Sequence, residues 1–201
     1  MTAITVGQPL ATVRDRFLPG DLRDRLLARI LERESEFTWA ATRRGSSPHR
    51  RALELATRHL GPLEEELLWS LCKGIDDGAG GLGIDPAQLA TLTVTVTASQ
   101  AGCYYRPHRD RSAIGPESTR VVSAVAFLHD RPARFRGGEL WMHGPASPTA
   151  SGAAERPVTV IPPVDNRLVL FDSRILHEVR PVTTSDDRFS SSRFSIVAWA
   201  S

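Results

Sequence analysis

The sequence has few cysteines, almost no lysine and no long apolar segment. Its two cysteines, Cys72 and Cys103, are too few for a disulfide framework and lack metal-binding spacing. No run of residues approaches the roughly 20 apolar residues needed to span a bilayer. Residues 1–5 lack the basic start and the apolar run of a secretory leader. We therefore expect a reduced, cytoplasmic protein without membrane contact.

Basic tracts are also missing. The net charge is only +2, and Lys73 is the single lysine, so the positive charge is almost all arginine. A dedicated nucleic-acid-binding protein is therefore not expected. Hydrophobic residues make up 41% and charged residues 24% of the 201 residues, which is typical of one globular domain, expected over 1–201. Nothing in the sequence specifies an oligomeric state.

Residues 1–88 contain two predicted helices. An apolar stripe at helical spacing covers residues 22–34. A second helix follows Gly61 and Pro62, with three consecutive glutamates in its first turn, where the helix dipole favours carboxylates. The glycine-rich stretch 74–83 lacks the lysine and the strand–helix context of a phosphate loop, so we interpret it as a connector. This part is expected to be a helical support region.

From residue 89 onward apolar residues recur at every second position, as they do in a strand with one buried face. Leu92, Val94 and Val96 alternate with threonines, which predicts a half-buried strand. Further short strands are predicted at 121–128, 140–143, 158–161, 168–171 and 194–199. The predicted fold class is therefore mainly β with N-terminal helices (α+β). Its core, residues 89–201, would be a double-stranded β-helix, which is a cupin-like jelly roll.

Three residues have the composition of an iron site. His108 and Asp110 are two positions apart, so in an extended strand their side chains point to the same face. His177 supplies a second imidazole from a later strand, which must lie alongside the first. Two histidines and one carboxylate form a facial triad that leaves three positions of an octahedral Fe(II) open. The His-x-Asp pair alone occurs often by chance, so the interpretation depends on the surrounding motifs.

These motifs together resemble the Fe(II)/2-oxoglutarate-dependent oxygenases, in the branch similar to prolyl 4-hydroxylases. The similarity lies in Tyr105-x-x-His108-x-Asp110, Phe135–Leu140, Asn166–Phe171, His177–Val182, and Arg193-x-Ser195 ahead of Trp199. The resemblance covers roughly residues 90–200. It implies a dioxygenase with Fe(II) as cofactor and 2-oxoglutarate and O2 as co-substrates. Such an enzyme decarboxylates 2-oxoglutarate to succinate and hydroxylates an unactivated C–H bond.

The resemblance also implies roles for the residues around the metal. His108, Asp110 and His177 would be the iron ligands. Arg193 would bind the distal carboxylate of 2-oxoglutarate, because a guanidinium matches a carboxylate bidentately. Ser195 shares a strand face with Arg193 and would add a hydroxyl donor. Arg188 is the alternative carboxylate-binding residue.

Tyr105 matches a tyrosine that lines the pocket in this family, although an ordinary aromatic at the barrel mouth is an equal interpretation. The sequence departs from the family where animal-type prolyl hydroxylases place two further tyrosines. Here these stretches read Ala98-Ser99 and Ala126-Phe127. The remaining candidates for donors to the co-substrate are Thr95, Thr97 and Ser195.

The substrate is expected to be an amino acid, a peptide or a secondary metabolite. Arginines near the metal motifs, among them Arg109, Arg111 and Arg136, predict an anionic group on it, although a coding bias toward arginine is an equal interpretation. The loop 144–157, rich in small residues, is a predicted lid. One alternative is a nucleic-acid demethylase of the same superfamily, although Arg188 and Arg193 do not have the spacing of that branch. The other is a non-catalytic β-barrel that binds a metal or ligand without turnover.

Overall fold

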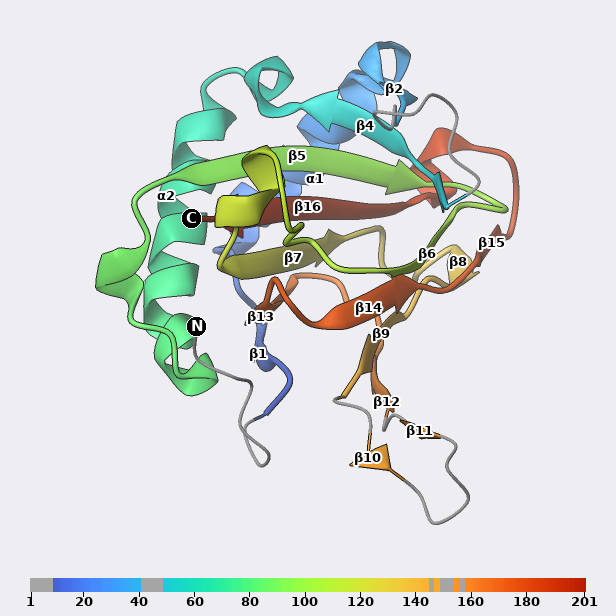
Figure 1. Cartoon of the computed structure of the whole chain (residues 1–201). Helices are drawn as coiled ribbons and strands as arrows, with labels where there is room; N and C mark the ends of the chain where they lie inside the picture. The colour runs from blue at the N-terminus through green and yellow to red at the C-terminus, as the bar shows by residue number, and fades with distance from the viewer. Residues whose placement is uncertain (1–8, 41–48, 145–146, 149–153, 156–157) are drawn as a thin grey trace.

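The computed structural model describes residues 9–40, 49–144, 147–148, 154–155 and 158–201. Two antiparallel sheets enclose the interior of a jelly roll, and helices cover the outer face of the larger sheet (Figure 1). The larger sheet has seven strands in the order β1 (Thr12–Asp15), β13 (Arg167–Asp172), β7 (Val122–Leu128), β16 (Arg193–Ala200), β5 (Leu92–Ser99), β4 (Leu53–Ala56) and β2 (Thr38–Trp39).

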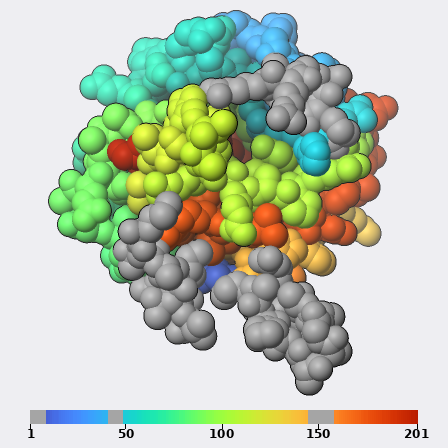
Figure 2. All heavy atoms as spheres, viewed as in Figure 1, coloured from blue at the N-terminus to red at the C-terminus, as the bar shows by residue number. Residues whose placement is uncertain are grey.

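The smaller sheet has five strands. Their order is β12 (Val158–Ile161), β9 (Leu140–His143), β14 (Leu176–Val179), β6 (Tyr104–His108) and β3 (Arg50–Arg51). Two further pairs join β15 (Val182–Thr184) to β8 (Phe135–Gly137) and β10 (Ser147–Pro148) to β11 (Ala154–Glu155). Figure 2 shows the same side in space-filling form, with yellow-green residues near 110–120 above the orange residues of β14.

Two α-helices pack against the large sheet, α1 (Gly20–Glu32) and α2 (Leu63–Ala79). Short 3-10 helices are Glu34–Glu36, Thr57–Leu60, Gly80–Leu82, Pro86–Gln88, Pro116–Thr119 and Phe189–Ser191. One apolar core lies between the helices and the large sheet, where Leu26 and Leu71 contact the cluster that contains Ile196. A second core, which includes Phe171 and Met142, fills part of the space between the sheets. The site described below occupies the rest of that space.

The predicted fold class is confirmed, and each strand predicted from residue 89 onward is present within one or two residues of its expected ends. The alternation of apolar and polar residues was sufficient for β5, because Val96 and Ala98 on one of its faces belong to a core. Strand β7 differs, since it is buried along its whole length and pairs with β13 and β16. No helix among the described residues is long and apolar enough to cross a membrane.

Three predictions about local structure were wrong or incomplete. The glycine-rich stretch is helical through Ala79, because Gly74 and Gly78 lie against the sheet too closely for a larger residue. Residues 1–88 supply β1 to β4 to both sheets as well as helices. Asp110 lies beyond the end of β6, so the His-x-Asp pair is not contained in one strand. The predicted lid 144–157 falls mostly outside the described residues.

Candidate active site

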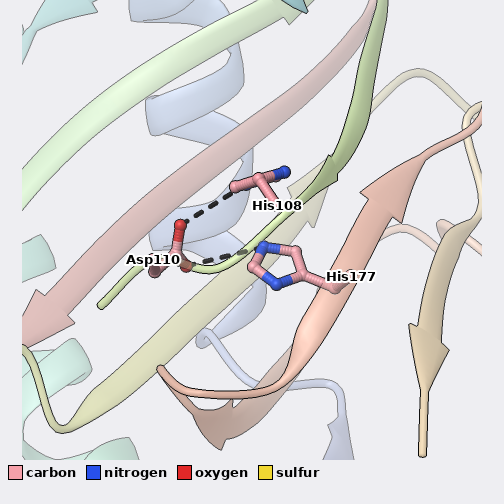
Figure 3. A group of neighbouring side chains, drawn as sticks. All are labelled: His108, Asp110 and His177. Carbon is pink, nitrogen blue, oxygen red and sulfur yellow. Dashed lines mark ion pairs between the residues drawn. The ribbon is translucent and has the colours of Figure 1, made fainter. Parts of the chain in front are cut away.

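His108, Asp110 and His177 meet between the sheets (Figure 3). His108 and His177 are direct partners in the register of β6 with β14, so strand pairing alone brings the imidazoles together. Nε2 of His108 lies 3.5 Å from Oδ1 of Asp110, and Nε2 of His177 lies 3.6 Å from Oδ2. One ligand atom from each residue falls within 4.8 Å of the others, which is a spacing that one metal ion can bridge.

Both histidines present the nitrogen that a metal needs. Nδ1 of His108 lies 2.9 Å from the carbonyl oxygen of Arg106, and Nδ1 of His177 lies 2.9 Å from that of Ile175. A carbonyl oxygen only accepts hydrogen bonds, so Nδ1 carries the hydrogen in each ring. The Nε2 lone pairs are therefore directed at Asp110. This backbone support fixes the tautomer and the ring orientation, as is usual for metal-binding histidines.

The electrostatic environment favours the protonation states of metal ligands. Burial lowers the pKa of His177 to about 4, against the opposing effect of Asp110, so the imidazole is neutral at neutral pH. Burial alone would raise the pKa of Asp110, but His177, His108 and the Ser123 hydroxyl outweigh it and hold the pKa below the usual range. His177 is therefore a neutral imidazole and Asp110 a carboxylate, and together with the His108 imidazole they form a ligand set that suits a divalent cation of intermediate softness such as Fe(II).

The three residues line a cavity of about 500 Å³ between the sheets. Its walls include Thr95, Thr97, Tyr105, Arg109, Arg193, Ser195 and Trp199, together with Arg50, Glu54, Glu117 and Arg120. A volume of this size accommodates a small-molecule ligand. The ring of Tyr105 stacks on His108 with centroids 3.4 Å apart, so this tyrosine forms part of the wall beside the metal ligands.

Arg193 places a buried positive charge in the same cavity. Its side chain is carried by the first residue of β16, lies over the ring of Phe127 at 4.8 Å and is 3% exposed. Among the described residues, neither Nε of Arg193 nor Oγ of Ser195 has a hydrogen-bond partner. Burial lowers the pKa of Arg193 to about 10, with Glu139 opposing, so the guanidinium stays charged at neutral pH. A buried cation beside an unpaired hydroxyl fits a carboxylate ligand.

Gly138 makes room for this arginine. Its φ is +72°, and a Cβ at this position would lie 2.5 Å from Cδ of Arg193. Gly137, the residue before it, also has a positive φ. The close approach to Arg193 is an additional constraint that the sequence alone did not indicate.

The structure separates the two candidate carboxylate-binding residues. Arg188 is exposed, contacts Asp186 and lies in a different surface pocket. Of the arginines expected to face the substrate, Arg109 lines the cavity, whereas Arg111 and Arg136 are not among its lining residues. Sequence reasoning also missed Ser123, which donates a hydrogen bond to Asp110. The only sign of Ser123 in the sequence was a single hydroxyl residue inside the otherwise apolar strand β7.

Residues 92–201 match the 2OG-Fe(II) oxygenase superfamily, and the chain belongs to this family. A curated relative is an uncharacterized PKHD-type hydroxylase of Synechocystis sp., 25% identical over 185 residues, which are 91% of this chain. The chain spans about 60% of the length of that relative. The predicted enzyme class and cofactors, iron and 2-oxoglutarate, are those of the family.

Solved structures share the fold. A prolyl-4-hydroxylase of Pseudomonas putida aligns with a TM-score of 0.65 and 24% identity, covering 95% of this chain and 91% of that one. A Trichoplax adhaerens prolyl hydroxylase, bound to a hypoxia inducible factor peptide, aligns with a TM-score of 0.63 and 19% identity. This alignment covers 95% of this chain and 83% of that one. The epimerase SnoN from nogalamycin biosynthesis aligns with a TM-score of 0.65 and 17% identity, covering 96% of this chain and 78% of that one. At these identities the likeness concerns the fold.

Proposed function

We propose that this chain is an Fe(II)- and 2-oxoglutarate-dependent dioxygenase that hydroxylates an unactivated C–H bond of an amino acid, peptide or secondary metabolite. The observation that carries the proposal is one cavity that contains both a cluster of two histidines with an aspartate and a buried arginine. Nε of this arginine has no hydrogen-bond partner among the described residues. The cluster suits the metal and the arginine suits the co-substrate. Few other chemistries require both.

His108, Asp110 and His177 would hold the Fe(II). Their combined charge is −1, which leaves the ferrous ion partly uncompensated and favours an anionic co-ligand. When bound, Fe(II) and 2-oxoglutarate would supply the oxidation chemistry, in which one atom of O2 goes to the substrate and the other to succinate, with release of CO2. The hydrogen bonds at Nδ1 would keep each histidine ring oriented for binding the metal through Nε2.

Arg193 and Ser195 would bind the distal carboxylate of 2-oxoglutarate. Both line the cavity from the same face of β16, and in the part of the chain that the structure describes Nε of Arg193 and Oγ of Ser195 have no hydrogen-bond partner. Low exposure of Arg193 strengthens this charge-assisted contact, because little water competes for the guanidinium. Tyr105 would wall the pocket beside His108 and restrict the movement of that ring.

The substrate would enter from the remaining part of the cavity. Among the structures with a similar fold, the Trichoplax enzyme is bound to a peptide and SnoN to nogalamycin RO. Either size class is compatible with a cavity bounded by Arg50, Glu54 and Arg109. We still propose an anionic group on the substrate. Arg109 would bind it, because Arg111 and Arg136 do not line the cavity.

The test is an incubation of the purified protein with Fe(II), 2-oxoglutarate, O2 and a panel of amino acids, peptides and secondary metabolites. We expect succinate, together with a product that is heavier by one oxygen atom. His177→Ala should remove both signals. Succinate without any change of product mass would point to an epimerase, and loss of a methyl group from an added oligonucleotide would point to a demethylase. Absence of succinate from wild type across the panel would support a non-catalytic barrel.

A further inference from the structure

Asp110 occupies a position that the strand ladder does not fix. Strand β6 ends at His108, so Asp110 lies in the loop that follows. Two other hydrogen bonds hold the backbone of this loop. The amide of Arg111 donates to the carbonyl of Ser173 at 2.9 Å, and Nη1 of Arg120 donates to the carbonyl of Asp110 at 3.3 Å. These bonds place the main chain, but they leave the rotation of the carboxylate undetermined.

Two buried serines fix that rotation. Oγ of Ser123 donates to Oδ2 of Asp110 at 2.6 Å, and Oγ of Ser173 lies 2.8 Å from Oγ of Ser123. Neither serine has any exposed surface. A hydroxyl has one hydrogen, and Ser123 gives its hydrogen to the carboxylate, so Ser173 must be the donor to Ser123. The result is a directed chain from Ser173 through Ser123 to Asp110, whose bonds polarise one another.

Packing alone does not explain these hydroxyls. Ser123 is the only polar residue in β7, which is buried along its whole length. Alanine would suit the apolar surroundings, whereas a buried hydroxyl costs free energy unless it is hydrogen-bonded. Ser173 is itself anchored, since its amide donates to the carbonyl of Val121 at 3.0 Å. The hydrogen-bonded serines therefore connect Asp110 to β7, which lies between β13 and β16 in the large sheet.

We propose that Ser123 and Ser173 are positioning residues of the metal centre, which hold the Asp110 carboxylate toward His108 and His177 before a metal binds. The proposal rests on the ligand set given under the proposed function. A carboxylate that is already oriented loses less rotational freedom on binding, so the affinity for the metal rises. Partners of this kind, outside the ligands themselves, typically change metal affinity by 10–100-fold.

The test is a titration of the metal-free protein with Co(II), followed by visible absorption and calorimetry without 2-oxoglutarate. Wild type should bind one ion. Ser123→Ala should bind it roughly 10–100-fold more weakly, with an altered Co(II) spectrum. Ser173→Ala should give a smaller loss, because Ser123 can still donate. The control is Ser70→Ala, which removes a buried hydroxyl that donates to Glu66 on α2, and it should leave the affinity unchanged.

The outcomes separate this proposal from the ligand set. If wild type binds no Co(II), or if His177→Ala binds it equally well, the ligand set is wrong. If wild type binds Co(II) and Ser123→Ala binds it with the same affinity and spectrum, the positioning role is overturned. Thermal unfolding of each metal-free variant reports any purely structural effect. If Ser123→Ala does not fold, Ser173→Ala provides the test. Weaker Co(II) binding by this variant supports the positioning role of the two serines, and unchanged Co(II) binding overturns it.

Discussion

At the scale of single residues, Arg193 is the most informative side chain outside the metal cluster. A guanidinium that is 3% exposed, with Nε unpaired among the described residues, is costly unless an anion joins it. The nearby Phe127 ring offers only a cation–π contact at 4.8 Å. The cavity beside it is the place from which a carboxylate can supply the missing partner.

Arg193→Ala should therefore raise the apparent constant for 2-oxoglutarate. Hydrogen bonds to charged groups contribute roughly 1.5–3 kcal/mol, which corresponds to about one to two orders of magnitude in affinity. Steady-state succinate production at varied 2-oxoglutarate gives the measurement. Arg188→Ala is the matched control, because this arginine is exposed in a separate pocket, and it should change the constant little. The reverse ranking of the two variants would transfer the carboxylate contact to Arg188.

The sequence was sufficient to propose the metal cluster and Arg193, but not the residues that support them. His108, Asp110 and Arg193 stand in motifs whose chemistry is visible in one dimension. Ser123 and Ser173 do not, because an isolated serine in an apolar run has many ordinary explanations. Their role is visible only in the folded protein, which brings Ser123 together with Asp110 and Ser173, 13 and 50 positions away in the sequence.

At the scale of elements, helix α2 shows how packing can override a local pattern. Its glycines predicted a loop, yet the helix continues to Ala79. A Cβ on Gly74 would lie 2.7 Å from Cε2 of Phe17 and 2.8 Å from Cδ2 of Leu168. The absence of a side chain thus lets α2 approach the large sheet closely. The gain in contact with the core offsets the poor helix propensity of glycine.

Gly74→Ala should consequently destabilise the protein, although alanine is the better helix former. Overpacking of a close contact costs about 1–3 kcal/mol, which exceeds the propensity gain of roughly 1 kcal/mol. Urea unfolding measures the difference. The control is Gly80→Ala at the end of the same helix, where the backbone is helical and no atom lies within 4 Å of a Cβ. It should be neutral or stabilising, and a stabilising Gly74→Ala would contradict the close packing.

Asp165 joins a helix to the strands through a buried carboxylate. It accepts hydrogen bonds from Nη2 of Arg23 on α1 at 2.9 Å, from the amide of His129 at 3.0 Å and from Nε of Arg131 at 2.6 Å. Burial alone would raise the pKa of Asp165, but these partners outweigh it and lower the pKa below the usual aspartate value. The native state thus binds the proton less readily than the unfolded chain does.

Asp165→Asn should lower the free energy of unfolding by about 1.5–3 kcal/mol at pH 7. Because the native pKa is lowered, the stabilisation is complete above the unfolded-state pKa near 4 and is lost as the pH falls through the native pKa. The free energies of unfolding of wild type and variant, measured between pH 7 and pH 2, should become equal at the acid end of this range. Asp77→Asn breaks the half-exposed pair with Arg14 and should cost less than about 1 kcal/mol. A difference at Asp165 that did not vary with pH would refute this role.

At the scale of the whole molecule, the cavity depends both on residues 92–201, which match the family, and on residues that precede them. Arg50 on β3 and Glu54 on β4 line it, although both precede residue 92, where the family match begins. Their ion pair, 2.6 Å long, faces the same space as His177. The long alternating strands were predictable, whereas β3 and the other short N-terminal strands carry too few residues to show a period. Their pairing is decided by tertiary contacts alone.

A crystal structure of the protein grown without O2, with Mn(II) in place of Fe(II) and with 2-oxoglutarate, would test the proposed site most directly. We expect one ion bound by Nε2 of His108, Nε2 of His177 and the Asp110 carboxylate. We also expect the distal carboxylate of 2-oxoglutarate to lie on Arg193, with the Ser195 hydroxyl as a further donor. An ion bound elsewhere, or 2-oxoglutarate located away from Arg193, would show that these residues are not the metal and co-substrate site.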